Sequence, residues 1–212
     1  MIDLTRAKDI FAQHKIDLSD EQLGQLDRYA ELLVEWNQKM NLTTITDPQG
    51  ILIKHFLDSI LLLPYMEGGD TLIDVGTGAG FPGVPLKIMR PQLHLTLLDS
   101  LNKRLRFLKE VLGQLGLEAA VVHARAEEGG RMPNLRAQFS FVTARAVAPL
   151  NLLCEYCLPF LQMGGTFLAM KGPEPEEEIA TAKKAVYLLG CELEGVEHFT
   201  LPGGDARSLV RI

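Results

Sequence analysis

Cysteine is scarce in this chain, with three among 212 residues. An odd number in a chain of this length argues against a disulfide framework and for a reducing compartment. Long apolar runs are also missing, since none reaches the roughly 18 residues that a membrane span requires. Residues 1–6 lack a basic start followed by an apolar stretch, so nothing resembles a secretory signal. We therefore expect a cytoplasmic protein without a membrane partner.

Positive charge is in short supply, because 21 Lys and Arg stand against 27 Asp and Glu, a net charge of −6. Nucleic-acid binders are usually basic, so the total argues mildly against such a partner. The distribution matters more, since residues 80–145 carry ten basic and five acidic side chains. Each cluster alone is most simply a solvated helix face. A basic middle in an acidic chain is still compatible with a surface that follows phosphates.

The first third of the chain is predicted to be helical. Ser19 begins a capping box and is followed by apolar residues at helical spacing, which predicts an amphipathic helix over 19–40. The pair Asp47-Pro48 predicts the start of a third helix that ends near residue 64. A Gly-Gly-Asp turn then closes the segment, so we expect residues 1–69 to form a small helical appendage.

From residue 70 the pattern changes to short apolar runs that alternate with helical stretches. The runs predict strands at 71–75, 94–99, 119–123, 139–144 and 165–170, with helices near 84–90, 101–115, 149–158 and 175–189. This alternation implies an α/β domain over 70–212 with a parallel sheet covered on both faces. Two final strands, 191–200 and 206–212, are separated by a turn alone and predict an antiparallel hairpin. Such an ending is expected of Rossmann-like class I methyltransferases and not of dinucleotide dehydrogenases.

A glycine-rich run follows the first predicted strand and extends from Asp74 through Gly76 and Gly78 to Gly80. In doubly wound folds the ligand binds at the carboxyl ends of the strands, where glycine lets the backbone approach it closely. However, Gly78, Gly80 and Gly83 also satisfy the dinucleotide fingerprint. The glycines alone therefore leave two cofactor classes open.

The acids beside this loop favour one of the two classes. Asp74 would repel a pyrophosphate, which binds to bare N–H groups at a helix N-terminus. S-adenosylmethionine has no phosphate, and its ammonium and sulfonium groups suit a nearby carboxylate. Asp99 ends the second strand and could accept hydrogen bonds from the ribose hydroxyls. The simpler interpretation is that Asp74 caps the turn and Asp99 caps the next helix. Because both acids, the glycines and the final hairpin agree, we predict S-adenosylmethionine as the cofactor.

The segment after the fourth strand, residues 142–149, bears on the methyl acceptor. It contains neither the Asn/Asp-Pro-Pro-aromatic motif that orients exocyclic amines nor the nucleophilic cysteine of C5-pyrimidine enzymes. A purine ring nitrogen has a ready lone pair and requires neither, because positioning then supplies most of the catalysis. Arg145 in this segment could stack on a base or hold a phosphate.

Several short motifs, spread in order along nearly the whole chain, resemble one family. They are Trp36-Asn37 with Asn41-Leu42-Thr43, Lys54-His55-Phe56-Leu57-Asp58-Ser59, the run from Asp74 to Gly83, Leu97-Leu98-Asp99-Ser100, and Arg145-Ala146 with Lys171-Gly172. With them the chain resembles the bacterial 16S rRNA guanine-N7 methyltransferases, also called glucose-inhibited division protein B. The resemblance implies methylation of guanine N7 in the 530 loop of 16S rRNA. The partner would be 16S rRNA or the 30S ribosomal subunit.

Carried onto the matching positions, the resemblance implies that Gly76, Phe81, Ala126-Glu127 and Arg145 contact the cofactor. The chain departs from the family at Ala79, where a proline is often found in the glycine loop.

Five residues are candidate catalytic residues on the side of the methyl acceptor: Arg145, Lys171, Asn41, His55 and Asp58. Lys171 follows the fifth predicted strand, at the edge of the sheet where ligands bind in such folds. His55 and Asp58 share a helix face, and a buried hydrogen bond between them is as good an interpretation as a role facing the acceptor. Asn41 follows a helix end, where it could be only a C-cap.

Three points limit the alternatives. Cys154 and Cys157 form a C-x-x-C pair, but four zinc ligands are not evident, so we expect a core pair and no structural metal. A dinucleotide-dependent oxidoreductase is favoured by the glycines and opposed by Asp74 and the final hairpin. A methyltransferase for another RNA or a small molecule, and a non-catalytic ribosome-assembly factor, also stay open. We expect a monomer.

Overall fold

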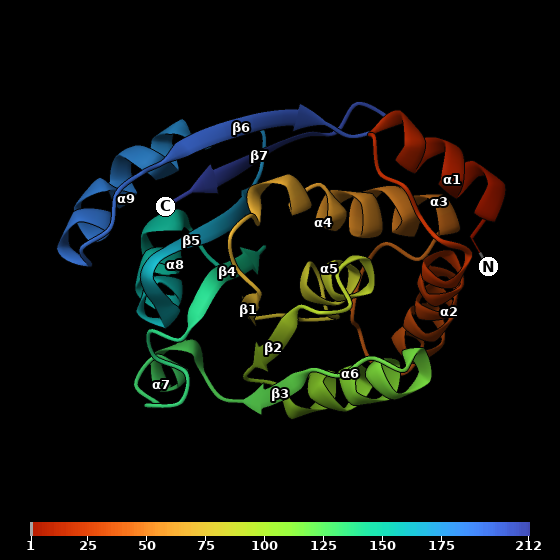
Figure 1. Cartoon of the computed structure of the whole chain (residues 1–212), viewed down its shortest axis with the longest axis horizontal. Coiled ribbons are helices and arrows are strands. Elements are labelled where there is room, and N and C mark those ends of the chain that lie inside the picture. Colours follow the sequence, from red (N-terminus) through yellow and green to blue (C-terminus); the bar gives the residue numbers. More distant parts are fainter. Residues whose placement is uncertain (1) are drawn as a thin grey trace.

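A seven-stranded sheet forms the centre of the computed structural model, which describes residues 2–212 (Figure 1). Its strands lie in the order β3-β2-β1-β4-β5-β7-β6. They are β1 (Thr71–Val75), β2 (His94–Asp99), β3 (Ala120–His123), β4 (Phe139–Arg145), β5 (Leu161–Lys171), β6 (Gly195–Thr200) and β7 (Ala206–Arg211). The first five strands pair in parallel, and β7 pairs antiparallel with both β5 and β6. The predicted parallel sheet with an antiparallel C-terminal hairpin is confirmed.

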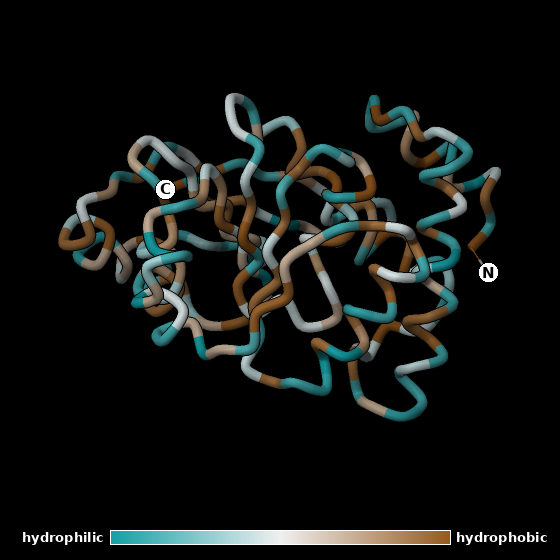
Figure 2. The backbone as a smooth tube through the Cα atoms, turned by 60° about the horizontal axis from the view of Figure 1, so that its bottom comes forward, coloured by the Kyte–Doolittle hydropathy of each residue, from teal (hydrophilic) through white to brown (hydrophobic). Residues whose placement is uncertain are grey.

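Helices cover both faces of this sheet. They are α5 (Gly83–Met89), α6 (Asn102–Leu115), α7 (Ala126–Gly129), α8 (Leu150–Cys157) and α9 (Glu176–Leu188). Successive strand residues point to opposite faces, so Leu72 of β1 joins a core under α5 and α6 while Ile73 joins a core under α8 and α9. Burial on both faces explains why the strands are continuous apolar runs. In Figure 2, hydrophobic stretches run through the middle of the backbone trace, and many of its outer turns are hydrophilic.

The N-terminal helices pack onto the α5–α6 side of the sheet. They are α1 (Leu4–Gln13), α2 (Asp20–Asn37), α3 (Pro48–Gly50), the π-helix η1 (Ile51–Leu57), α4 (Asp58–Ile60) and the 3-10 turn η2 (Leu63–Tyr65). The capping box predicted at Ser19 is present, with Gln22 as its partner. The predicted third helix is also present, although its middle is π-helical. Helices α2, α5 and α6 share one continuous hydrophobic core, which fixes the N-terminal segment against the sheet.

Two strand boundaries differ from the prediction, and one short helix was not predicted. Strand β5 begins at Leu161 because that residue still pairs with Phe139 across a register shift. Strand β6 begins at Gly195 because its partner Arg211 is the last residue of β7, so residues 191–194 are not part of the ladder despite their alternating pattern. Helix α7 is a single turn, which is too short to show a periodicity.

Candidate functional site

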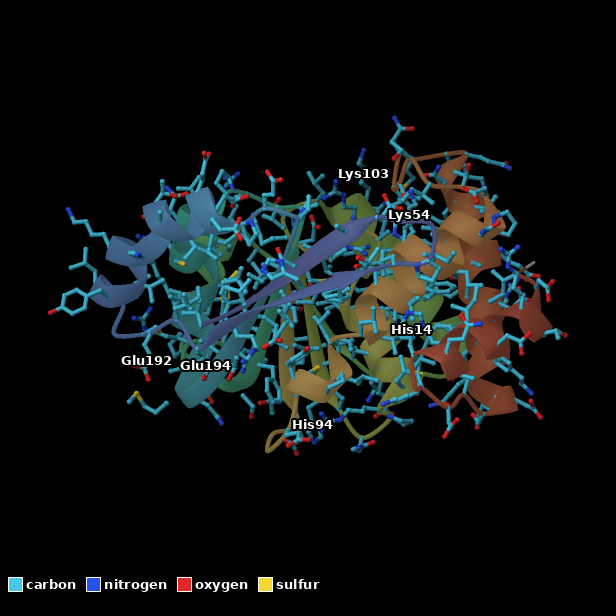
Figure 3. All side chains as sticks on the ribbon, turned by 90° about the horizontal axis from the view of Figure 1, so that it is seen from above. His14, Lys54, His94, Lys103, Glu192 and Glu194 are labelled. Carbon is cyan, nitrogen blue, oxygen red and sulfur yellow. The ribbon has the colours of Figure 1, made fainter. Side chains whose placement is uncertain are left out.

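Two cavities open at the edge of the sheet where the parallel strands end. Figure 3 shows His94, at the start of β2, on the opposite side of the molecule from Lys103, which follows the end of that strand. The smaller cavity, of about 350 Å³, lies over the ends of β1 and β2. The larger, of about 920 Å³, lies between the end of β4 and the N-terminal helices. Ala146, directly after β4, lines both and therefore marks where they meet.

The glycine loop after β1 has a backbone that only glycine adopts easily. Gly76 has φ +67°, and an added Cβ would lie 2.8 Å from Cγ2 of Val147. Gly80 has φ +98°, and an added Cβ would lie 2.5 Å from the Tyr29 hydroxyl oxygen. The N–H of Gly78 donates to Oδ2 of Asp99 over 3.0 Å, which ties the loop to the end of β2. Glycine is needed here both for the left-handed backbone and for close packing.

Asp74 lies beneath this loop and reaches neither cavity. It is completely buried, and its Oδ2 accepts hydrogen bonds from the Thr77 hydroxyl (2.7 Å) and the Gly83 N–H (3.0 Å). Its Oδ1 faces the Thr143 hydroxyl at 3.4 Å. Burial raises the pKa of Asp74 to about 6, although these donors act in the opposite direction. The carboxylate thus holds the loop against the start of α5, in place of the predicted contact with a cofactor ammonium.

Aromatic side chains support the loop from the N-terminal helices. The Tyr29 hydroxyl of α2 donates to the carbonyl of Ala79, and its ring stacks on Phe81 with centroids 5.2 Å apart. Phe81 also stacks on His55 at 4.4 Å and is 5% exposed. Phe81 and Gly80, both predicted as cofactor contacts, are therefore packed inward and do not line either cavity.

The smaller cavity brings together four of the predicted cofactor residues: Gly76, Asp99, Ala126 and Glu127. Asp99 is 2% exposed; its Oδ1 accepts from the Leu101 N–H (2.8 Å) and its Oδ2 from Gly78 and from Nη1 of Arg104 (3.3 Å). A carboxylate offers about four acceptor sites, so one is left for a ligand hydroxyl. Because Leu101 is itself the N-cap residue of α6, Asp99 holds the turn before the helix and does not cap it, and this role is compatible with a contact with ligand.

Sequence reasoning missed other walls of the smaller cavity, among them Ser100, Arg104 and Tyr156. Ser100 and Arg104 follow the carboxyl end of β2 closely, so the expectation that ligands bind at the carboxyl ends of parallel strands could have identified them. Tyr156 arrives from α8, and no local pattern indicates its position.

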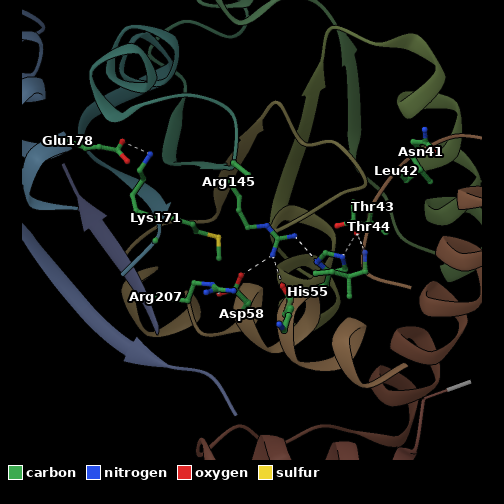
Figure 4. Close-up of a pocket in the computed structure, with 15 residues that line it drawn as sticks. Asn41, Leu42, Thr43, Thr44, His55, Asp58, Arg145, Lys171, Glu178 and Arg207 are labelled. Carbon is green, nitrogen blue, oxygen red and sulfur yellow. Dashed lines mark hydrogen bonds and ion pairs between the residues drawn. The ribbon is translucent and has the colours of Figure 1, made fainter. Parts of the chain in front are cut away.

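All five candidate catalytic residues line the larger cavity (Figure 4). Arg145 is the centre of this group. Its Nη1 donates to Oδ2 of Asp58 (3.0 Å) and to the Lys54 carbonyl (3.1 Å), and its Nη2 lies 3.2 Å from Nδ1 of His55. Its guanidinium also lies over the Phe81 ring, 5.0 Å from the centroid. Arg145 therefore joins the end of β4 to the N-terminal helices and is directed away from the smaller cavity, where a cofactor contact was predicted.

His55 is neutral and its two ring nitrogens have fixed roles. Burial and, to a smaller extent, the neighbouring charge of Arg145 lower the pKa of His55 to about 3. Arginine has donors only, so Nδ1 of His55 must accept and Nε2 must carry the proton. Nε2 lies 2.9 Å from Oγ1 of Thr43, to which it donates. The alternative of a direct bond between His55 and Asp58 is not formed, because Arg145 binds both.

Asp58 is almost completely buried, with 2% of its surface exposed. Its Oδ1 has no hydrogen-bond partner among the described residues and faces Nε of Arg207, of β7, at 3.7 Å. Burial raises the pKa of Asp58, while Arg145 and Arg207 oppose the rise. Lys54 forms an ion pair with Asp205 at 2.9 Å, so a second contact ties the hairpin to the same helical segment. No sequence signal indicated Arg207 at this site.

Lys171 and Asn41 occupy opposite walls. Nζ of Lys171 binds Oε2 of Glu178 at 2.6 Å and the carbonyl of Ala148 at 3.2 Å, so its charge is paired. The sequence alone indicated Glu178 only as one of several acidic residues at the start of a helix, and not as a partner of Lys171. Asn41 is exposed at the rim. The C-cap that was considered for it is Gln38 instead, while Oδ1 of Asn37 accepts from the N–H groups of residues 42 and 43 in the loop that follows α2.

Cys154 and Cys157 are buried in the core under α8, and burial raises the pKa of Cys154 to about 11. Within residues 2–212, no cluster of three or more His, Cys, Asp or Glu side chains could hold a metal ion. None of the helices in that range is long and apolar enough to cross a membrane.

Comparison with known proteins gives one consistent result. A family model described as "rRNA small subunit methyltransferase G" matches residues 22–210. The chain is 51% identical over 191 residues to the ribosomal RNA small subunit methyltransferase G of Alkaliphilus metalliredigens, covering 89% of this chain and 80% of that protein. It is 47% identical over 204 residues to the protein of the same name from Geobacillus thermodenitrificans, covering 95% and 86%.

Solved structures agree on the fold. An O-methyltransferase from Bacillus cereus in complex with SAH superposes with a TM-score of 0.62 at 13% identity, covering 88% of this chain and 91% of that one. Aeropyrum pernix fibrillarin with natively bound S-adenosyl-L-methionine superposes with a TM-score of 0.56 at 19% identity, covering 74% of each. At these identities the likeness establishes the Rossmann-like methyltransferase fold.

Proposed function

The chain belongs to the rRNA small subunit methyltransferase G family, and on that premise we infer that it methylates guanine N7 of 16S rRNA with S-adenosylmethionine. The family relationship supports the cofactor, the transferase activity and the rRNA substrate. We further propose that the target guanine lies in the 530 loop and that the methyl group is transferred without a general base.

One observation supports this function best: the two cavities meet at Ala146. The smaller has residues that fit the cofactor, because Asp99 keeps one acceptor site for a ribose hydroxyl and Gly76, which has no side chain, lines the cavity beside it. When bound, S-adenosylmethionine supplies an electrophilic methyl group on a sulfonium. The larger cavity, of about 920 Å³, has the volume to hold a base and is bordered by Arg207 and Lys54. Donor and acceptor sites are therefore neighbours, as direct transfer requires.

No residue of the larger cavity is placed to remove a proton. Neutral His55 uses both ring nitrogens, and Lys171 is paired with Glu178. Asp58 is buried and bound by Arg145. Guanine N7 carries an in-plane lone pair and needs no base, so this arrangement suits it. We assign Arg145 and Lys171 to fixing the cavity walls, and Asn41, at the exposed rim, to contact with the RNA.

We propose that residues 1–69 act as an appendage that forms one wall of the acceptor cavity. The contacts of Arg145 with Asp58 and His55 support this, because they connect that appendage to the end of β4. Placement of the base would then depend on both parts of the chain.

The decisive experiment is incubation with radiolabelled S-adenosylmethionine and either undermethylated 30S particles or naked 16S rRNA, followed by mapping of the label. We expect one methylated guanine N7 in the 530 loop. Gly78→Trp is the control for loss of cofactor binding: an added Cβ at Gly78 meets only the Gly76 carbonyl oxygen at 3.9 Å, but its φ of +61° strains any side chain, so the variant is used only if its circular dichroism matches that of wild type. Calorimetry should show loss of S-adenosylmethionine binding in this variant and no binding of NAD by either protein. Label on another atom would refute the N7 assignment, and 30S binding without label would indicate an assembly factor.

A further inference from the structure

Thr43 is a wall of the larger cavity whose hydrogen bonds are unusually well defined. It lies in the loop between α2 and α3, half-buried, beside His55 (Figure 4). Its Oγ1 lies 2.9 Å from Nε2 of His55 and 3.0 Å from the N–H of Ile45. The direction of each of these bonds follows from the groups around them.

The network fixes the Thr43 hydroxyl as a donor. Arg145 can only donate, so it makes Nδ1 of His55 the acceptor and leaves the ring proton on Nε2. Nε2 and the Ile45 N–H therefore both donate to Oγ1, which fills its two lone pairs. The hydroxyl hydrogen remains, and no described residue accepts it in the structure. Thr43 thus presents to the cavity a group that can donate one hydrogen bond and can accept none.

We propose that the Thr43 hydroxyl donates a hydrogen bond to O6 of the target guanine and so selects guanine over adenine. The proposal rests on the function inferred above. N7 and O6 lie on the same edge of guanine, so a base that turns N7 toward the cofactor cavity turns O6 toward a neighbouring wall. Adenine carries an amino donor where guanine carries O6. A hydroxyl with both lone pairs occupied cannot accept from that amino group, and two donors would face each other.

The surroundings of Thr43 favour a neutral acceptor over a phosphate. Its partner His55 is neutral, 7% exposed and stacked on the buried Phe81 ring. The cations that suit a phosphate are elsewhere on the cavity wall, on Lys54 and Arg207, and they are more exposed than Arg145. A single uncharged donor in this position fits the carbonyl oxygen of a base.

The test pairs changes in the protein with changes in the base. The target position of 16S rRNA, assembled into 30S particles, carries guanine, hypoxanthine (which keeps O6) or 2-aminopurine (which keeps N7 and lacks O6). Wild type, Thr43→Val and the control Thr43→Ser are compared in single-turnover methyl transfer. Because the bases also differ in intrinsic N7 reactivity, the ratio of wild-type to variant rate on each base is the readout.

We expect Thr43→Val to be about 10-fold slower than wild type on guanine and hypoxanthine, and no slower on 2-aminopurine. Thr43→Ser, which keeps the hydroxyl, should follow wild type on all three bases. An equal loss on every base, or no loss on guanine, would overturn the proposal. If Thr43→Val does not fold, Thr43→Ala, which also removes the hydroxyl, takes its place in the same ratios on the three bases. A wild-type protein that labels no guanine N7 would instead show that the inferred function itself is wrong.

Discussion

Replacing Arg145 by alanine should destabilise the protein in a way that depends on pH. The change removes both hydrogen bonds that tie Asp58 and Lys54 to the end of β4. Asp58 then remains buried, with only Arg207 at 3.7 Å to balance its charge. Breaking a buried ion pair from one side costs about 3–5 kcal/mol, and this applies at a pH where the remaining carboxylate is charged.

The sign of the pH dependence follows from the pKa of Asp58. Burial already raises this pKa in the folded protein, and loss of Arg145 raises it further. A folded-state pKa above the unfolded value means that the folded protein binds more protons, so its stability falls as the pH rises through that window. The variant should therefore be closest to wild type near the unfolded pKa of aspartate, about 4, and furthest from it at neutral pH and above.

Urea unfolding at several pH values would measure this effect in wild type, Arg145→Ala, Asp58→Asn and the double variant. The double variant should lose less free energy of unfolding than the sum of the single variants, because it has no buried charge left unpaired. The difference in free energy of unfolding between the double variant and Asp58→Asn should not vary with pH. Lys8→Ala is the matched control, since its ion pair with Asp20 is exposed and should contribute less than about 1 kcal/mol. Strict additivity, or a loss from Arg145→Ala that is the same at every pH, would refute the reasoning.

Three further results are expected. Tyr29→Phe removes the donor to the Ala79 carbonyl and should cost about 1–3 kcal/mol by thermal unfolding and weaken S-adenosylmethionine binding, while exposed Tyr187→Phe should change neither. Asp99→Ala should weaken cofactor binding on the order of 10- to 100-fold by calorimetry, and a similar loss for an analogue without ribose would contradict the ribose contact. The single-turnover rate should be flat between about pH 7 and 9, because the pKa of His55 is about 3; a limb that disappears in His55→Gln would show that it acts as a base.

The sequence allowed the sheet to be predicted better than its edges. Strands β1 and β2 begin and end where their apolar runs do, because both are buried on two faces and bounded by polar turns. The limits of β5 and β6 depend on which partner residue continues the ladder, as at Leu161 and Arg211, and that partner is distant in sequence. Local pattern therefore indicates a strand, and pairing decides its length.

At the site, the sequence indicated which residues meet better than where their side chains point. In a parallel sheet, residues at the carboxyl ends of the strands lie at one edge, which predicted that Asp74, Asp99 and Arg145 lie together. All three are at that edge in the structure. This prediction could not distinguish Asp99, which lines a cavity, from Asp74, whose oxygens turn to the loop beneath which it lies. The partner of Asp58 on β7, Arg207, was not predicted, because nothing local relates the hairpin to the π-helical segment.

The N-terminal helices connect the two cavities through separate contacts. The Tyr29 hydroxyl of α2 holds the glycine loop through Ala79, on the cofactor side. His55 and Asp58, on the acceptor side, hold Arg145 at the end of β4, only one residue before the shared wall at Ala146. A transfer to N7 without a base relies on the relative position of donor and acceptor for its rate. Because one set of helices fixes both sides, a change in how they dock on the sheet should alter the methyl-transfer rate even where each substrate still binds.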